Sequence, residues 1–78
     1  MSEKKDLYRL EEEKSLEQIA DYFEKLASDL RNGHITFDDG TSIKLPKTLT
    51  LDIDVDEKHK EHIISTNAEF ELKWVGEK

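Results

Sequence analysis

Three aspartates at alternate positions, Asp52, Asp54 and Asp56, come closest in this sequence to a set of residues that could do chemistry. Alternate residues of a strand share one face, so the three carboxylates would project together. Hard cations such as Ca²⁺ and Mg²⁺ prefer clusters of oxygens of this kind. The spacing lacks the glycine turn and the distal glutamate of a helix-loop-helix calcium loop, and an outward row of aspartates also keeps a strand soluble. The three aspartates are therefore candidate ligands for a divalent cation, and a solvated strand face is the competing interpretation.

The histidines offer a second possible metal site. His59 and His62 lie three residues apart, a spacing that can place two imidazoles on one metal ion if the backbone there is helical. No cysteine and no third histidine close by completes the set. We interpret both as solvated side chains, and His34 as a loop or strand-start residue.

The inventory for catalysis is poor. The chain has no cysteine, no glycine-rich phosphate loop and no nucleophile elbow. Its paired carboxylates lie on predicted solvent faces, where their pKa values would not be separated enough for distinct acid and base roles. We therefore predict no enzymatic activity, no catalytic residues and no cofactor.

Two aromatic residues are candidates for binding a partner. Trp74 is the only tryptophan and lies in register with Phe70 and Leu72, so its ring is expected to close one end of the core. The alternative is a partly exposed anchor, since tryptophan and tyrosine are enriched at binding hot spots. Tyr22 flanks the apolar stripe of the helix described below and could extend such a patch.

Charge and hydropathy restrict the function classes. Nineteen acidic residues against 12 basic ones give a formal charge of −7, which repels phosphate backbones, so a nucleic-acid partner is not expected. The longest apolar stretch is the pair Ile63 and Ile64, which predicts no membrane-spanning segment, and the first residues do not resemble a signal peptide. The absence of cysteine suits a reducing compartment, so a cytoplasmic location is expected.

These side chains must be positioned by one helix and several strands. Ser15 and Gln18 have the spacing of a capping box, and Gly33 stands where a helix commonly ends in a residue that tolerates positive φ. Between them runs one apolar stripe at three- and four-residue steps. Its members are Leu16, Ile19, Ala20, Phe23, Leu26, Ala27 and Leu30.

After Gly33 the apolar period changes to two, which predicts strands. Residues 34–37 and 42–45 form a predicted hairpin around an Asp39-Gly40 turn, and Pro46 ends its second strand. A third strand follows at 49–56, then a charged segment at 56–62 that is either a loop or an extended hairpin end. The last strand has two faces: Ile64, Thr66, Ala68, Phe70, Leu72 and Trp74 on one, and Glu69, Glu71 and Lys73 on the other.

The fold class expected from these elements is α+β, a two-layer sandwich with the order β-α-β-β-β-β. Residues 1–13 supply a first strand in this interpretation, with a frayed lead-in to the helix as the alternative. The amphipathic helix would pack on one face of an antiparallel sheet of four to five strands, and the apolar rows at 49–55 and 68–74 would be dry. Because 78 residues support one core, the chain is expected to be a single domain, 1–78, with tails at 1–6 and 76–78 disordered.

With these elements in place, the chain resembles the Amphi-Trp domain family of small bacterial and archaeal proteins. The resemblance rests on the helix at 16–33, the alternating strand at 49–55 and the closing sequence Phe70-Glu71-Leu72-Lys73-Trp74. It implies a domain whose function is not established, and it transfers no site residues.

The function expected from the sequence is a small cytoplasmic accessory or protein-interaction module. It would act through the open, polar sheet face or an exposed strand edge, on a protein partner or as a homodimer. The residues displayed on that open face are Thr50, Asp52, Asp54, Glu69, Glu71 and Lys73. The alternative is a small-ligand or divalent-cation-binding protein that uses the acidic sheet face.

Overall fold

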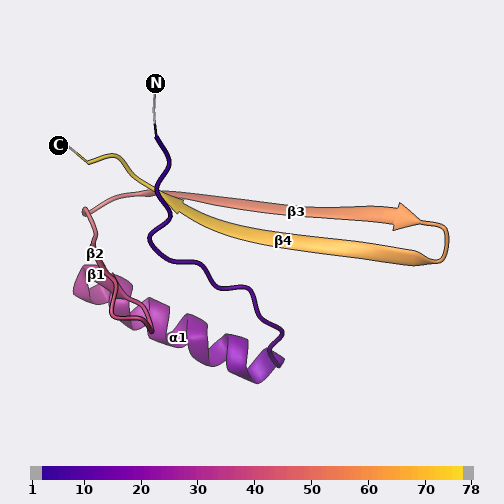
Figure 1. Cartoon of the computed structure of the whole chain (residues 1–78), viewed down its shortest axis with the longest axis horizontal. Coiled ribbons are helices and arrows are strands. Elements are labelled where there is room, and N and C mark those ends of the chain that lie inside the picture. The colour runs from indigo at the N-terminus through magenta and orange to yellow at the C-terminus, as the bar shows by residue number, and fades with distance from the viewer. Residues whose placement is uncertain (1–2, 77–78) are drawn as a thin grey trace. The chain divides into compact units, whose positions relative to one another are not determined.

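The computed structural model describes residues 3–76, which contain one helix and four strands. The helix α1 (Leu16–Asn32) comes first, followed by β1 (His34–Thr36), β2 (Ser42–Lys44), β3 (Thr50–Lys60) and β4 (Ile63–Lys73) (Figure 1). The α+β class is confirmed, with the helix ahead of all four strands. The chain forms two compact units, Met1–Leu45 with α1, β1 and β2, and Pro46–Lys78 with β3 and β4.

The helix begins and ends at the predicted residues. The Ser15 hydroxyl oxygen accepts from the backbone N–H of Gln18 at 3.1 Å, and the Gln18 side-chain oxygen accepts from the Ser15 N–H at 3.0 Å, which completes a capping box. Gly33 ends the helix at a φ of 80°, a left-handed conformation that glycine adopts without a Cβ penalty. Both ends of α1 are therefore fixed by local hydrogen bonds.

Loss of the cap should destabilise α1. Replacing Ser15 by alanine leaves an N–H group of the first turn without its acceptor, and we expect a loss of about 1 kcal/mol in the free energy of unfolding. Thermal melts followed by far-ultraviolet circular dichroism measure this loss. Ser28→Ala, on the exposed part of the same helix, is the matched control. Equal melting temperatures for the two variants would show that the cap contributes nothing.

The short β1–β2 hairpin follows the helix directly. Its strands pair antiparallel, with Ile35 opposite Ile43, and they are joined by a turn in which Gly40 has a φ of 92°. The backbone N–H of Thr41 donates to the Asp39 carboxylate at 2.9 Å, which closes the turn. The predicted hairpin and its Asp-Gly turn are thus confirmed, with shorter strands than expected.

The first unit holds its helix against this hairpin through one buried side chain and one ion pair. Ile35 is 6% exposed and lies on β1, the strand that α1 packs against. The Lys25 ammonium donates to Asp29 at 2.8 Å and also to the Thr36 carbonyl oxygen, while the Thr36 N–H donates to Asp29 at 3.2 Å. Asp29 therefore fixes the distance between α1 and the end of β1.

Acid is expected to weaken this contact. The hydrogen bond from Lys25, followed by that from the Thr36 N–H, lowers the pKa of Asp29 below its ordinary value of 3.8. A carboxyl group whose pKa is lowered by folding adds stability above pH 3.8, and that stability is lost as the pH falls through the folded pKa. Asp29→Asn should flatten the fall in stability below that pH, measured by denaturant melts at several pH values. Asp21→Asn, exposed on the same helix, should retain the fall; identical curves for the two variants would contradict this role of Asp29.

Residues 3–15 form neither strand nor helix, so the expected first strand is absent from the described part of 1–13. This segment is attached by a side chain and not by a ladder of backbone hydrogen bonds. The Tyr8 ring stacks on Phe37, with 4.4 Å between the ring centroids and 17° between the planes. The charged run Glu11-Glu12-Glu13 interrupts the alternation that a half-buried strand would need.

The second unit is a long antiparallel hairpin of β3 and β4, each 11 residues long. The two strands include most of the charged segment at 56–62. Of the two interpretations made from the sequence, this segment is therefore an extended hairpin end, with Glu61 and His62 as its turn. The four strands form two sheets of two strands each, and neither sheet has a third strand within residues 3–76. Pro46, which has no N–H to give to a ladder, lies at the boundary of the two units.

Within the described part of the second unit, no helix and no third strand covers the apolar rows of β3 and β4, and the packing of α1 on these rows stays a prediction. Leu51, Ile53 and Val55 are 59%, 52% and 68% exposed. Alternation along a strand determines which face is apolar, but it does not determine whether anything covers that face. The apolar stripe of α1 is only partly covered as well, since Leu16, Ile19, Phe23 and Leu30 are exposed.

The remaining predictions on organisation concern domains, tails and membranes. Residues 3–6 and Gly76 are exposed and lie outside the helix and strands, while the other predicted tail residues, 1, 2, 77 and 78, lie outside the described residues. The single domain over 1–78 stays a prediction. In the part of the chain that the structure describes, no helix has the length and apolar character needed to cross a membrane.

Candidate interaction surface

The register of β3 with β4 gives the hairpin two chemically different faces. Leu51 lies opposite Leu72, Ile53 opposite Phe70, and Val55 opposite Ala68. We call these six side chains the apolar face. Because residues directly opposite each other in a ladder project to the same side, they form three consecutive uncharged pairs.

The exposure of the apolar face is unusual for a hairpin of this kind. Two strands alone are marginally stable in water, and they gain stability when a further strand or helix covers their apolar side. Leu51, Ile53 and Val55 are more than half exposed, and Leu72 is half-buried. Contiguous exposed apolar groups of this type are typical of protein-binding surfaces. The apolar face is therefore the strongest candidate for a binding site in the second unit.

The opposite face of the hairpin is acidic. Asp52 lies opposite Glu71, and Asp54 lies opposite Glu69, so like charges face each other at two adjacent positions. The Lys73 ammonium donates to Asp52 at 3.2 Å and lies 3.6 Å from Glu71, and its hydrogen bond to Asp52 raises the pKa of Lys73. The register thus places Asp52 and Asp54 of the aspartate row beside Glu71 and Glu69.

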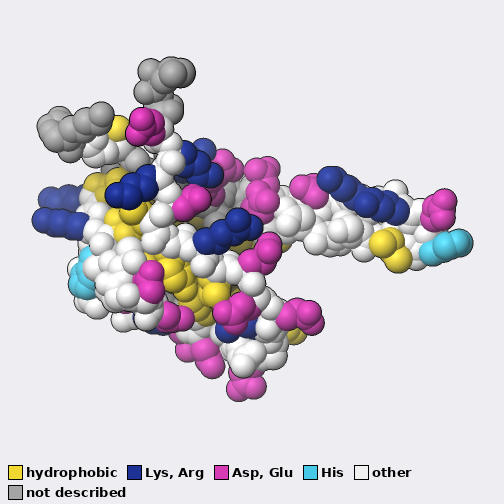
Figure 2. Space-filling model, in the orientation of Figure 1, with side chains coloured by type: hydrophobic (Ala, Val, Ile, Leu, Met, Phe, Trp, Pro, Cys, Tyr) yellow, Lys and Arg dark blue, Asp and Glu magenta, His cyan; other side chains and the backbone are white. Residues whose placement is uncertain are grey.

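These carboxylates do not assemble a metal site in the structure. Asp52, Asp54 and Asp56 project from one face of β3 as predicted, but a lysine already occupies the end of the row at Asp52. Within residues 3–76, no group of three or more histidines and acidic residues is arranged to hold a metal ion. Figure 2 shows acidic and basic side chains interspersed along the visible side of the hairpin. The arrangement resembles a solvated, mixed-charge surface.

The far end of the hairpin separates the two histidines. His59 lies on β3 opposite Ile64, and its Nε2 atom is 2.9 Å from a Glu57 carboxylate oxygen. His62 belongs to the turn, where the backbone is not helical. The helical spacing that would have placed both imidazoles on one ion is therefore absent here.

Trp74 lies just beyond the end of β4, at the open end of the hairpin, and is half-buried. It lines two shallow hollows of the second unit, one with Thr50 and Leu72 and the other with Pro46 and Leu49. A half-buried indole of this kind covers neighbouring apolar atoms and still presents one edge to a partner. Both interpretations of Trp74 made from the sequence thus remain predictions.

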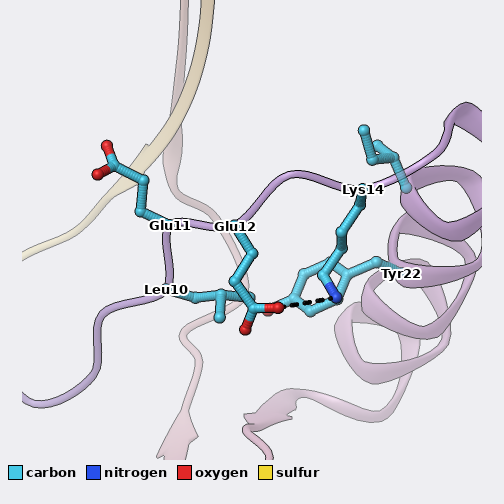
Figure 3. A pocket seen from close by; sticks show the side chains of 6 residues that line it. Leu10, Glu11, Glu12, Lys14 and Tyr22 are labelled. Carbon is cyan, nitrogen blue, oxygen red and sulfur yellow. Dashed lines mark ion pairs between the residues drawn. The ribbon is translucent and has the colours of Figure 1, made fainter.

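Tyr22 belongs to the first unit and lines a shallow hollow of about 240 Å³. In Figure 3 Leu10, Glu12 and Lys14 point toward Tyr22, whereas Glu11 points away, and Lys14 pairs with Glu12 at 3.4 Å. Ligand pockets usually have about 300–1,000 Å³ and enclose their ligand. This open hollow is smaller, so Tyr22 is better placed for a surface contact than for holding a small molecule.

Sequence reasoning assigned the residues of the apolar face to the core and did not name them as a candidate binding surface. No local signal could have found them, since an apolar row has the same alternation whether it is covered or open. Sequence reasoning also did not identify the exposure of the pair Ile63 and Ile64. Ile63 and Ile64 are 64% and 60% exposed at the far end of the hairpin, where the surrounding residues are charged.

A comparison with protein families identifies the family of this chain. A family model of the Amphi-Trp domain matches residues 1–78, the whole chain. The chain belongs to the Amphi-Trp domain family. Neither the curated proteins nor the solved structures contain a match to this Amphi-Trp chain. Since the match covers both units, the β3–β4 hairpin and its apolar face are part of the Amphi-Trp domain itself.

Proposed function

We propose that this chain is a small cytoplasmic accessory module without catalytic activity, which binds a protein partner through the β3–β4 hairpin. The observation that carries the proposal is the exposure of the apolar face, where Leu51, Ile53 and Val55 are each more than half in water. The absence of cysteine supports a reducing compartment.

The two faces of the hairpin have complementary roles in this proposal. The three uncharged pairs of the apolar face provide the desolvated centre that binding hot spots need. The acidic face, with Asp54 opposite Glu69, cannot stack on a second acidic surface without like-charge repulsion. A partner therefore approaches from the apolar side, and the acidic side keeps the complex soluble.

The alternative of a small-ligand or cation site on the acidic face has less support. Asp52 already accepts a hydrogen bond from Lys73, and the row of aspartates has no arrangement of three ligands in residues 3–76. Cations would then bind only weakly and with the screening of ordinary surface charges.

Site-specific photo-crosslinking in the native host tests the proposed function. A photoreactive amino acid at Ile53 probes the apolar face, and the same amino acid at Asp54, the next residue of β3, probes the acidic face. We expect a discrete protein adduct from position 53 and at most a trace from position 54, with the adduct identified by mass spectrometry. Equal adducts from both positions, or an adduct from position 54 alone, would overturn the proposal.

A further inference from the structure

The outer edge of β4 is a feature of the hairpin distinct from its apolar face. β4 pairs with β3 on one side only, and no other strand in the described residues continues the sheet. Its outer edge presents backbone donors and acceptors that a further strand can use. The question is which strand has the side chains to fit there.

We propose that this edge pairs antiparallel with β4 of a second copy of the chain. A closed pair of identical strands has a two-fold axis, and full overlap of Ile63–Lys73 puts that axis at the middle residue, Ala68. Each residue of β4 then faces a residue equally far from Ala68 on the other side. The hydrogen-bonding ladder extends over all 11 residues.

In this register no like charges face each other. Glu69 lies opposite the second copy's Asn67, and Glu71 lies opposite the second copy's Ser65, so each carboxylate meets an amide or hydroxyl donor. Lys73 lies opposite Ile63. A one-residue or two-residue shift of the axis toward the C-terminus places Glu69 opposite Glu69 or Glu71, which is destabilising. The charges of β4 thus disfavour registers shifted toward the C-terminus, and full overlap gives the longest ladder.

The same register accounts for the exposed apolar residue at the far end of the hairpin. Ile64 lies on the side of the apolar face, but its neighbour on β3 is His59. After pairing, Ile64 lies opposite the second copy's Leu72, and Thr66 lies opposite Phe70. The two apolar faces then join into one continuous surface of a four-stranded sheet, wider than either hairpin offers alone.

The edge of β3 does not fit a second copy in this way. Full overlap of Thr50–Lys60 places the axis at Val55, so that Asp54 faces the second copy's Asp56 twice. It also places Ile53 opposite Glu57 on the apolar side. Self-pairing is therefore specific to β4, and the pair closes as a dimer without forming a chain of hairpins.

Single cysteines test the pairing directly, because the natural chain contains none. In the proposed dimer the two Ala68 residues face each other at about 5 Å between Cα atoms, within reach of a disulfide. Val55 lies opposite Ala68 on β3, so two Val55 residues are separated by three strand spacings, about 14 Å. We expect Ala68→Cys to form a covalent dimer under mild oxidation at least ten times more readily than the matched control Val55→Cys.

A spin label attached to Ser65→Cys measures the register independently, and it leaves Ala68, the residue on the two-fold axis, unchanged. Six residues of strand separate the two labelled positions in the proposed dimer, so the labels should lie about 20 Å apart along the strand. Crosslinking of Val55→Cys as readily as Ala68→Cys would indicate stacked faces and would overturn the edge pairing, as would absence of a dimer by light scattering at high concentration. If the edge pairing is overturned, an adduct of another protein at position 53 would still support the proposed function. If neither the dimer nor that adduct is observed, both the edge pairing and the proposed function are contradicted.

Discussion

Replacing Ile35 by alanine is expected to lower the free energy of unfolding of the first unit by about 3 kcal/mol, the range of large-to-small changes at buried sites. Ile35 is 6% exposed and is the one buried hydrophobic residue among the described residues. It lies on β1 beneath α1, opposite Ile43. Since a unit this small has little stability in reserve, a change of this size should leave a large fraction unfolded at room temperature.

Denaturant melts followed by helix circular dichroism measure the effect of Ile35→Ala. Ile35→Val, which removes one methyl group, should cost about 1 kcal/mol. Ile43→Ala is the matched control in the opposite strand, and it should cost less than Ile35→Ala because Ile43 is only half-buried. If Ile43→Ala proved the more damaging of the two, the packing of α1 on β1 described above would be wrong.

The second large effect is expected on binding. Val55→Asp places a carboxylate in the middle of the apolar face, between the Ile53 pair and the charged end of the hairpin. A buried, unpaired charge at the centre of an interface costs at least about 2 kcal/mol, or roughly a 30-fold rise in the dissociation constant for the partner captured at position 53. Because Val55 is 68% exposed in the free chain, the substitution should leave the hairpin itself nearly unchanged.

The matched control for Val55→Asp is Thr50→Asp on the same strand. It adds the same charge on the acidic face, directly opposite Lys73, where the carboxylate has a cationic neighbour. Titration calorimetry with the purified partner should show a change of less than about threefold for this variant, as expected of a charge outside the desolvated centre. A similar loss for Thr50→Asp would show that net charge, and not the apolar face, controls affinity.

The local elements of this fold could be predicted well from the sequence because short-range rules determine them. Ser15, Gln18 and Gly33 form the caps that their types and spacing predict. The Asp39-Gly40 turn and the shared face of the three aspartates on β3 follow for the same reason, since a positive φ and a period of two depend only on neighbouring residues.

The long-range arrangement could not be predicted in the same way. Whether four strands form one sheet or two depends on which edges meet, and the alternating rows of β2 and β3 contain no information about that choice. The first segment of the chain also shows that a local pattern does not determine which elements pair. Tyr8 and Leu10 alternate as a strand would, yet Tyr8 is held by stacking on Phe37.

The candidate site was predicted in part. In its polar half, the shared strand face of Asp52, Asp54 and Asp56 was expected and is present, and the register adds Glu69 and Glu71 beside it. Its apolar half was expected to be core, because an apolar residue looks the same in a sequence whether it contacts its own chain or another protein. Exposure, which only a structure supplies, changes the interpretation of Leu51, Ile53 and Val55.

Hydrogen exchange of the two strands of the hairpin tests the central claim most directly. In the dilute free chain, amides of β3 and β4 should exchange much faster than those of α1, because a two-stranded hairpin is only marginally stable. In complex with the partner captured at position 53, protection should rise across Thr50–Lys60 and Ile63–Lys73 and stay constant in Leu16–Asn32. Protection that rises in α1 and remains unchanged in β3 and β4 would contradict the assignment of the hairpin as the binding element.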